Sequence, residues 1–339
     1  MHEEDGTFST ENIVCGFLTE RRKMKRLTVD IIIPTYRPQP SLREVLFKIS
    51  GQDYPVGHIL IINTEEKYWD PEISKDIPNV EVFHIPKSGF DHGASRNMGA
   101  GFSDADILIY MTQDAVPYDR KMVRNLILAF RRPMVKIAYA RQIPNEHCHI
   151  IEGCIRNFNY PEKGCIRTIE DLDEYGIKTF FCSNVCAAYS HETLRELGGF
   201  PRPCIFNEDM IFTGKALKLG YAAAYVPEAK VIHSHNYTNI QQFHRNFDNG
   251  VSQAMHPEIF KGIRSEGEGR KLVHETSRYL RSVGRGYLIP QLYAQSFFKL
   301  LGFKMGRAYR HLPKSIVRAC SLNKEFWDYQ NPEETDEEE

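Results

Sequence analysis

Carboxylates and an arginine occur in this sequence where predicted elements begin or end, and their chemistry suits a metal and a phosphorylated ligand. Asp114 follows the apolar run 107–111, which is predicted to be a strand buried on both faces. A carboxylate at the C-terminal end of such a strand lies where open α/β sheets bind ligands. Just upstream, a glycine-punctuated turn offers backbone N–H groups and the Arg96 guanidinium, which can bind an anion. This stretch predicts a metal–diphosphate site, with a capped helix followed by an ordinary strand as the alternative.

Two further groups lie downstream. Glu208 and Asp209 begin a predicted helix after a Gly-Gly turn, which would fix the direction of the Asp209 carboxylate. A positioned carboxylate can accept the proton of an attacking hydroxyl. The helix dipole alone also favours acidic residues in a first helical turn. A purely structural role therefore remains an alternative for both Glu208 and Asp209. His233 and His235 occupy alternate positions after a predicted strand, and their imidazoles therefore point the same way.

The elements that position these groups alternate between strand and helix. This order predicts an α/β fold with a mostly parallel central sheet, flanking helices and right-handed crossovers. The strands are expected at 29–33, 59–62, 80–85, 107–111, 135–140, 179–189, 221–226 and 230–232, and the main helices at 42–49, 120–130, 209–219 and 241–253. Residues 141–180 are expected to be an irregular loop that takes part in acceptor binding.

Composition excludes several classes of protein. Of the 339 residues, 42% are hydrophobic and 26% charged, as in soluble globular proteins, and the net charge of -1 gives no sign of nucleic-acid binding. No apolar run approaches the roughly 18–20 residues of a membrane-spanning helix. Eight irregularly spaced cysteines do not form a disulfide framework, which favours a reducing, cytoplasmic location. His147, Cys148, His149 and Cys154 lack the paired spacing of structural zinc sites and are expected to be loop residues and buried thiols.

Charge is unevenly distributed along the C-terminal part. Residues 270–324 contain twelve lysines and arginines and one acid, Glu275. Within them an apolar stripe is surrounded by basic residues; the stripe consists of Tyr293, Phe297, Leu301, Met305, Tyr309 and Leu312, and the basic residues are Lys299, Lys304, Arg307 and Arg310. Such a stripe usually packs on its own domain, but the basic bias favours a face that lies on a membrane surface.

Several motifs taken together resemble one family. The sequence contains, in order, IIIPTYRP at 31–38, HGASRNMGA at 92–100, TQDA at 112–115, LGGF at 197–200, NED at 207–209 and HSHN at 233–236. This series resembles the family 2 glycosyltransferases of the GT-A fold. The stretches TQDAVP, INTEEKY and FKMGRAYRHLPKSI are similar to bacterial rhamnosyltransferases that build surface polysaccharides. The resemblance covers roughly residues 28–325.

The resemblance implies an inverting transfer from a nucleotide-diphosphate sugar, with dTDP-rhamnose the first choice, to a hydroxyl of a growing, lipid-linked polysaccharide. It implies Mg²⁺ or Mn²⁺ as cofactor. Asp209 would be the general base, and Asp114 and His233, or else His235, would bind the metal. The donor side would be formed by Pro34, Thr35, Tyr36, Asn63, Arg96, Asn97, Gln113 and Asp114, and the acceptor side by Asn207 and Glu208.

The resemblance and the distribution of charge together suggest a division of the chain. Residues 1–26 would be a polar tail, with Met24 an alternative start of translation, and 27–255 the catalytic domain. Within that domain, 27–118 would bind the nucleotide sugar and 119–255 the acceptor. Residues 256–325 would form a basic helical extension and 326–339 an acidic tail. Peripheral association with the inner face of the cell membrane is expected.

Two departures from the family pattern affect the site. The usual Asp-x-Asp is Thr112-Gln113-Asp114 here, so one metal carboxylate is missing or replaced by Gln113. The second strand, which usually ends in an acidic pair near the base, ends in Asn63-Thr64-Glu65. A sugar-nucleotide-binding protein without transfer activity and a scaffold component of a polysaccharide assembly complex remain alternatives. A nucleotidylyltransferase is disfavoured because the first strand turn lacks a glycine- and basic-rich triphosphate loop.

Overall fold

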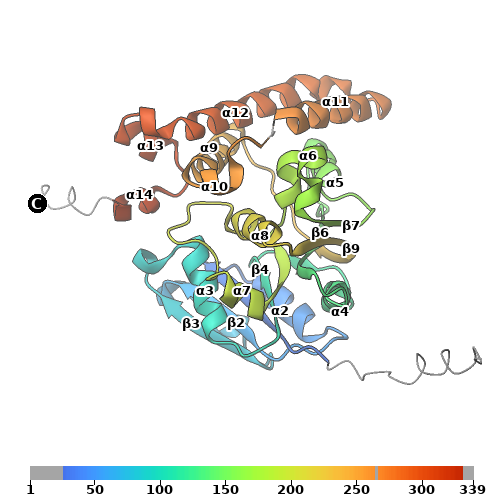
Figure 1. Ribbon diagram of the computed structural model, residues 1–339, viewed down its shortest axis with the longest axis vertical. Helices are drawn as coiled ribbons and strands as arrows, with labels where there is room; N and C mark the ends of the chain where they lie inside the picture. Colours follow the sequence, from blue (N-terminus) through green and yellow to red (C-terminus); the bar gives the residue numbers. More distant parts are fainter. Residues whose placement is uncertain (1–25, 264–265, 331–339) are drawn as a thin grey trace, which may run out of the picture.

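The computed structural model describes residues 26–263 and 266–330, and a nine-stranded sheet runs through this part of the chain (Figure 1). The strands are β1 (Val29–Tyr36), β2 (Ile59–Thr64), β3 (Val80–Ile85), β4 (Ile107–Met111), β5 (Val116–Pro117), β6 (Val135–Ile143), β7 (Cys165–Arg167), β8 (Cys186–Ser190) and β9 (Ala222–Ile232). Their spatial order is β3-β2-β1-β4-β8-β6-β9-β5, and β7 pairs with β9. The predicted tails at 1–25 and 331–339, including Met24, lie outside the described residues.

Most strands share one direction. β3, β2, β1 and β4 pair in parallel, and β6 and β9 run the same way, whereas β8 is antiparallel to both β4 and β6. The short β5 and β7 are antiparallel to β9. The predicted mostly parallel α/β sheet is therefore confirmed. The C-terminal ends of β1, β2 and β4 meet at one edge, as the sequence argument required.

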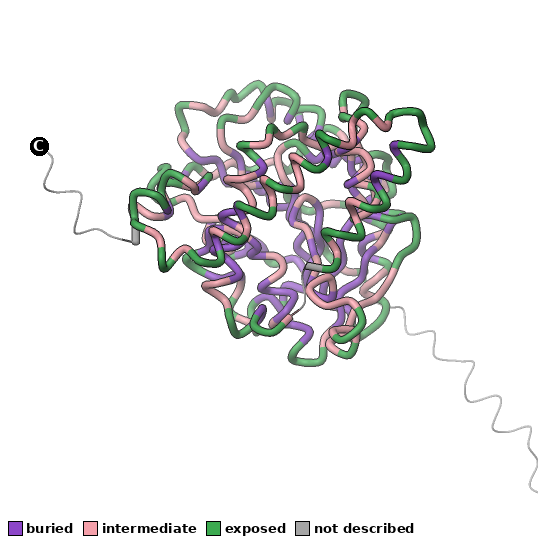
Figure 2. The backbone as a smooth tube through the Cα atoms, turned by 90° about the horizontal axis from the view of Figure 1, so that it is seen from above, coloured by how far each residue is buried: buried purple, intermediate pink, exposed green. Residues whose placement is uncertain are grey.

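Helices cover both faces of this sheet. They are α2 (Leu42–Ser50), α3 (His92–Gly101), α4 (Met122–Ala129), α5 (Ile150–Asn159), α6 (Leu172–Tyr175), α7 (His191–Glu196), α8 (Glu208–Lys218), α9 (Asn239–Met255), α10 (Pro257–Phe260), α11 (Glu266–Ser282), α12 (Ile289–Arg307), α13 (Lys314–Cys320) and α14 (Lys324–Gln330). Ile31 and Ile33 pack with α2 and α4 in one core cluster, and Ile32 packs with α7 and α8 in another. The alternation follows from the period of two along a strand. Figure 2 shows these buried segments inside an exposed outer shell.

Three expectations about elements were wrong in detail. The strand expected at 179–189 begins only at Cys186, and residues Gly176–Phe180 form a 3₁₀ turn. The strands expected at 221–226 and 230–232 are the single strand β9, which pairs with β6 across a register shift between Ala140 and Arg141. Such a bulge interrupts the alternating pattern without ending the strand.

The stretch 141–180 is largely structured. It contains the end of β6, the helices α5 and α6 and the strand β7. Ile151 and Ile155 of α5, four residues apart, pack against Leu280 of α11 and Leu292 of α12. The polar and aromatic composition of this stretch obscured that short apolar face, because its packing partners lie more than a hundred residues away.

The C-terminal helices lie directly on α9. α12 crosses α9 so closely that a Cβ added at Gly302 would lie 2.2 Å from the Phe243 carbonyl oxygen, and one added at Gly306 would lie 2.0 Å from that of Phe247. Further along α9, the buried Asp248 accepts hydrogen bonds from the Ser321 hydroxyl and from backbone N–H groups of the following residues. These contacts join α12 and the 321–323 turn to α9.

The apolar stripe of α12 is divided between two environments. Tyr293, Phe297 and Leu301 are exposed, whereas Met305 and Tyr309 pack with the buried Phe247. Packing on the protein itself therefore holds for the second half of the stripe only. None of the described helices is long and apolar enough to cross a bilayer.

Candidate active site

A cleft of 420 Å³ brings together residues from five helices and from the ends of the strands. Its wall includes Arg96 of α3, Asp209 of α8 and, after β9, His233 and His235. Thr112, two residues before Asp114, also lines it. Residues more than a hundred positions apart in the sequence thus face one space.

Asp209 is held firmly at the start of α8. Its Oδ2 accepts a hydrogen bond from the Asn184 backbone N–H (3.0 Å) and its Oδ1 accepts one from the Met210 N–H (2.7 Å). Asn207 precedes the helix in the left-handed conformation (φ 62°), which asparagine adopts more readily than most residues. Burial and the neighbouring Glu208 charge raise the pKa of Asp209, and the two hydrogen bonds lower it. The first two effects are larger, so the pKa of Asp209 is about 7. A carboxyl with this pKa is suited to accept a proton near neutral pH.

Glu208 is paired with a buried arginine. Its Oε1 lies 3.3 Å from Arg96 Nη1 and accepts a hydrogen bond from Asn184 Nδ2 (3.0 Å). Burial alone would raise the pKa of Glu208, but the Arg96 charge and the Asn184 hydrogen bond outweigh it and hold the pKa below its ordinary value. Arg96 also donates to the His92 carbonyl oxygen (2.8 Å). Glu208 is therefore an anion beside Asp209, and Nη1 of Arg96 is engaged within the protein, whereas its buried Nε has no partner among the described residues.

Asp114, His233 and His235 form a compact cluster at the other side of the cleft. Asp114 Oδ2 lies 3.5 Å from His233 Nε2 and 3.0 Å from His235 Nε2, and one ligand atom of each residue lies within 4.8 Å of the others. The Asp114 side chain is 42% exposed. Although burial opposes it, hydrogen bonds to the two histidines hold the pKa of Asp114 below its ordinary value. Both histidines that the sequence offers as alternatives reach Asp114.

Gln142 sets the orientation of His233. Its Oε1 lies 3.0 Å from His233 Nδ1 and also accepts a hydrogen bond from Arg156 Nη1. Because that oxygen can only accept, His233 Nδ1 carries a hydrogen, and the other ring nitrogen, Nε2, faces Asp114 and His235. A carboxylate and two imidazole nitrogens converging on one point have the donor chemistry of a divalent-metal site.

The comparisons with known proteins agree with this geometry. The family described as Glycosyl transferase family 2 matches residues 30–198. The O-antigen chain rhamnosyltransferase RfbN of Salmonella typhimurium is 35% identical over 303 residues, which cover 89% of this chain and 96% of that protein. The chain belongs to glycosyltransferase family 2. A second relative of this glycosyltransferase, the O-antigen chain rhamnosyltransferase WbaN of Salmonella anatum, is 32% identical over 300 residues, which cover 88% of this chain and 95% of the relative.

Solved structures confirm the GT-A fold of this glycosyltransferase. The mannosyltransferase PcManGT from Pyrobaculum calidifontis, determined with GDP-Man and Mn²⁺, superposes with a TM-score of 0.52 over 90% of this chain and 86% of its own, at 15% identity. Because the chain belongs to a family of enzymes, the comparisons support a glycosyltransferase. A non-catalytic binding or scaffold protein is not favoured.

The predicted donor-side residues of the glycosyltransferase are largely engaged with one another at the strand ends. Buried Thr35 donates from Oγ1 to Asn63 Oδ1 (2.9 Å). Gln113 pairs with the backbone of Tyr36 in both directions, accepting from its N–H (3.0 Å) and donating to its carbonyl oxygen (3.2 Å). The residue that replaces the expected metal carboxylate therefore braces the end of β1. His233 and His235 accompany Asp114 instead.

Some predicted residues lie outside the cleft wall. The amide of Asn97 exchanges two hydrogen bonds with the Phe200 backbone and so holds the Gly-Gly turn. Pro34 and Tyr36 are half-buried at the end of β1. Of the predicted acceptor residues, Asn207 and Glu208 line the cleft, and Asn207 Nδ2 donates to Asn249 (2.9 Å).

Sequence reasoning did not assign several polar residues of the cleft. Three are basic: Arg156 of α5, Arg245 of α9 and Lys299 of α12. Burial lowers the pKa of Lys299. Asn184 and Gln142 contact Asp209 and His233 directly. No motif marks these residues, because α5 and α12 reach the cleft only through tertiary packing.

The described part of the chain offers no support for a zinc site at 147–154. His149 precedes α5, and Cys148 and Cys154 are half-buried free thiols. The clustered metal-ligating side chains of the described residues are those of Asp114, His233 and His235.

Proposed function

We propose that this glycosyltransferase moves a rhamnosyl group from a nucleotide-diphosphate rhamnose, with dTDP-rhamnose the first choice, to a hydroxyl of a growing, lipid-linked surface polysaccharide. The sugar and the polysaccharide are supported by the two O-antigen chain rhamnosyltransferases that match over most of both chains. The observation that carries the chemistry is a carboxyl with a pKa of about 7, Asp209, in the same cleft as the two histidines that contact Asp114.

Asp209 is the general base of the proposed reaction. The acceptor hydroxyl attacks the anomeric carbon from the face opposite the leaving group, and its proton passes to the Asp209 carboxylate. One C–O bond forms as the bond between the sugar and the diphosphate breaks, so the anomeric configuration is inverted. The hydrogen bonds from Asn184 and Met210 leave the carboxylate little freedom to turn away, which keeps it aimed at the acceptor.

Asp114, His233 and His235 are the proposed metal ligands. When bound, a divalent cation acts as a Lewis acid and stabilises the negative charge that develops on the departing diphosphate. Mg²⁺ prefers an all-oxygen shell, whereas two imidazole nitrogens and one carboxylate suit a transition metal. We therefore favour Mn²⁺, which the structural relative PcManGT contains together with GDP-Man.

Three basic side chains supply further positive charge for the diphosphate. Arg156, Arg245 and Lys299 line the cleft together with Asp209 and His233. Arginine and lysine in a partly desolvated cleft bind phosphate oxygens strongly. The nucleoside is proposed to lie at the strand ends that carry Pro34, Thr35, Tyr36, Asn63 and Gln113, with Arg96 and Asn97 behind them. Asn207 and Glu208 are proposed to face the acceptor side.

The protein is proposed to work at the inner face of the cell membrane. Tyr293, Phe297, Leu300 and Leu301 are exposed on one side of α12, because the opposite side carries Gly302 and Gly306 and packs on α9. Exposed basic residues follow at Arg307, Arg310, Lys314 and Arg318. Aromatic and aliphatic side chains beside basic ones suit the interface of an anionic bilayer.

The proposal is tested in two steps. Thermal-shift measurements against a panel of nucleotide sugars, with and without Mn²⁺, identify the donor. The Asp209→Asn variant should then retain donor affinity within about twofold and lose transfer by about 10²–10⁴-fold. Asp76→Asn is the matched control, since Asp76 is exposed and its positive φ (60°) also suits asparagine. Near-normal transfer by Asp209→Asn would remove Asp209 from the mechanism.

A further inference from the structure

A second hollow opens beside the catalytic cleft. It has a volume of 310 Å³ and lies between the start of α5, the segment after β9, and α12. Glu152, His235, Tyr237 and Gln242 line both this pocket and the cleft, so the two spaces are contiguous. Small-molecule sites occupy roughly 300–1,000 Å³, and this pocket is at the small end of that range.

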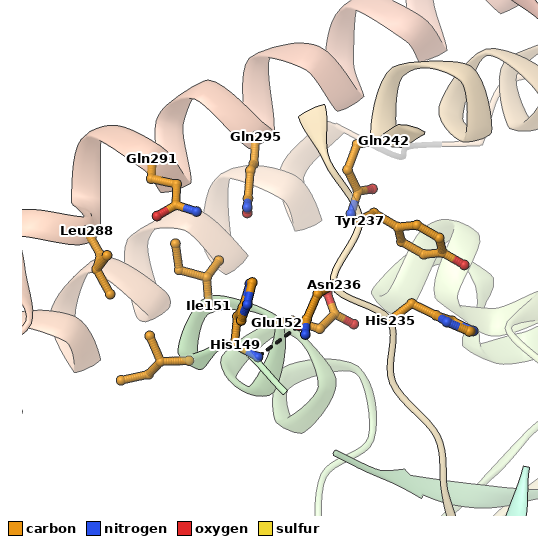
Figure 3. A pocket seen from close by; sticks show the side chains of 11 residues that line it. His149, Ile151, Glu152, His235, Asn236, Tyr237, Gln242, Leu288, Gln291 and Gln295 are labelled. Atoms are coloured by element: carbon orange, nitrogen blue, oxygen red, sulfur yellow. Dashed lines mark hydrogen bonds between the residues drawn. The ribbon is translucent and has the colours of Figure 1, made fainter. Parts of the chain in front are cut away.

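Amide side chains dominate the polar part of the pocket. Figure 3 shows Gln291 and Gln295 reaching from α12 toward His149 and Asn236. Asn236 is already engaged, because it accepts a hydrogen bond from the His149 N–H (2.8 Å) and donates one to the His147 carbonyl oxygen (2.9 Å). Asn236 therefore braces the wall, whereas none of the described residues forms a hydrogen bond with the side-chain amides of Gln291 and Gln295, which can bind a ligand.

Gln242 gives an independent sign of a ligand. Its side chain lines both spaces, and the residue is only 6% exposed. Among the described residues, none forms a hydrogen bond with its side-chain amide; the bonds at this residue are those of its backbone. Although the residue as a whole is buried, its amide atoms are open to the hollow, where they can hydrogen-bond a ligand or water that a ligand displaces.

We propose that this pocket binds a neutral sugar ring of the acceptor glycan, next to the sugar whose hydroxyl is glycosylated. The inference rests on the proposed function and extends it by a second acceptor subsite. Amides both donate and accept hydrogen bonds, as sugar hydroxyls do. Tyr237 adds an aromatic ring, which can pack against the apolar face of a sugar.

Charge separates this subsite from the diphosphate region. Arg156, Arg245 and Lys299 line the cleft but not the pocket, and the carboxylate of Glu152, which lines both, is paired with Arg156 (2.6 Å). An anionic ligand is therefore directed to the cleft and a neutral one to the pocket. All lining residues of the pocket come from position 149 onward, whereas the proposed nucleoside contacts lie between residues 34 and 113. The pocket thus lies apart from the proposed nucleoside contacts, on the side of the cleft that is left for the acceptor.

The test compares one-sugar and two-sugar acceptors. The probes are methyl glycosides of neutral hexoses and 6-deoxyhexoses and the corresponding disaccharides, with dTDP-rhamnose and Mn²⁺ present. The wild-type enzyme should use the best disaccharide with a KM about tenfold below that of its terminal monosaccharide, as expected for two or three added neutral hydrogen bonds. In Gln291→Ala/Gln295→Ala this ratio should fall to about one. The hydrolysis of the donor by water should be unchanged, which shows that the fold and the donor site are intact.

Matched variants separate the possible results. Asn157→Ala removes an exposed amide from α5 outside the pocket and should keep the tenfold preference. Gln242→Ala should also lose the preference for the disaccharide acceptor. If this variant is less stable, its hydrolysis of the donor shows whether it is still folded. A full preference for disaccharides in the double variant would overturn the subsite and leave the proposed function standing. Failure of the wild type to release nucleoside diphosphate from the donor, with either acceptor or water, would overturn both.

Discussion

Two aspartates of this glycosyltransferase occupy environments that move their pKa values in opposite directions. Burial and Glu208 raise the pKa of Asp209 to about 7, whereas hydrogen bonds from two histidines keep Asp114 ionised despite its partial burial. Two carboxyls with such different pKa values can have different roles in an active site, because one can exchange a proton while the other stays ionised and binds a cation. The sequence places both aspartates at element ends but carries no sign of this difference, because the groups responsible come from other elements.

The pKa of Asp209 determines the expected dependence of the rate on pH. The carboxyl can accept a proton only when ionised, so kcat/KM should rise with pH to a plateau above about 7 and fall about tenfold per pH unit below it. Because the Glu208 charge raises this pKa, Glu208→Gln should move the rising limb to lower pH. The measurement is a pH profile of both enzymes at saturating Mn²⁺. A limb that moves to higher pH in the variant would contradict the proposed electrostatic coupling.

Gln142 should tune the metal affinity through His233. In Gln142→Ala the His233 Nδ1–H loses its acceptor, so the ring is free to rotate or to change tautomer. Loss of such a partner typically weakens metal binding or activity by about 10–100-fold. The weaker Mn²⁺ binding should appear both as a higher Mn²⁺ concentration at half-maximal activity and as a higher Kd in a direct Mn²⁺ titration. Tyr160→Phe is the control, since it removes only a partner of the Gln142 amide nitrogen and retains the oxygen that meets His233. Equal Mn²⁺ affinity in Gln142→Ala and wild type would refute the role.

At the scale of elements, the sequence predicts what local patterns can encode. β1, β2 and β4 contain short apolar runs that were predicted as strands, and the run of β4 was predicted to be buried on both faces. α5 was missed because its apolar face is short and packs on α11 and α12, which no local pattern reveals. The stripe on α12 was recognised, but the pattern did not identify the glycine face as the buried one. As a result, the contribution of α12 to the cleft and to the adjoining pocket could not be predicted.

The glycine face of α12 gives a stability prediction. A methyl group at Gly306 would meet the Phe247 carbonyl oxygen at 2.0 Å, so Gly306→Ala must push α12 away from α9. Overpacking of this kind costs about 1–3 kcal/mol and should lower the melting temperature by several degrees. Gly269→Ala is the matched control, because Gly269 is also helical but has open space around its Cβ position, and alanine favours helix. A calorimetric scan in which Gly306→Ala is as stable as Gly269→Ala would contradict the close packing.

At the scale of the whole molecule, the net charge of -1 conceals a separation of charge along the chain. The net charge gives no sign of nucleic-acid binding, but a sum over the whole chain could not locate the basic surface. In Figure 1 the helices α11, α12 and α13 form one edge of the molecule, with the parallel strands β1–β3 toward the opposite edge. The cleft lies between, lined by Lys299 of α12 as well as by α8. A bilayer on the outer side of α12 would hold the proposed lipid-linked acceptor within reach of Asp209, the proposed general base.

Binding to an anionic bilayer is the prediction that follows from this arrangement. Tyr293 and Phe297 are 56% and 59% exposed on the outward side of α12, and burying each aromatic ring in the interface stabilises binding by up to about 1.5–3 kcal/mol. Neighbouring basic residues add about 1 kcal/mol each at low salt. The enzyme should sediment with vesicles rich in phosphatidylserine, less so as salt is raised, and Tyr293→Ser/Phe297→Ser should bind at least tenfold more weakly. Phe47→Ser is the control, since Phe47 is 70% exposed on α2, away from this surface. If Phe47→Ser weakened vesicle binding as much as Tyr293→Ser/Phe297→Ser, or if the wild type did not sediment with vesicles at low salt, α12 would not be a membrane-binding surface. The control decides this because Phe47 is also an exposed aromatic residue and differs from Tyr293 and Phe297 in its position on the molecule.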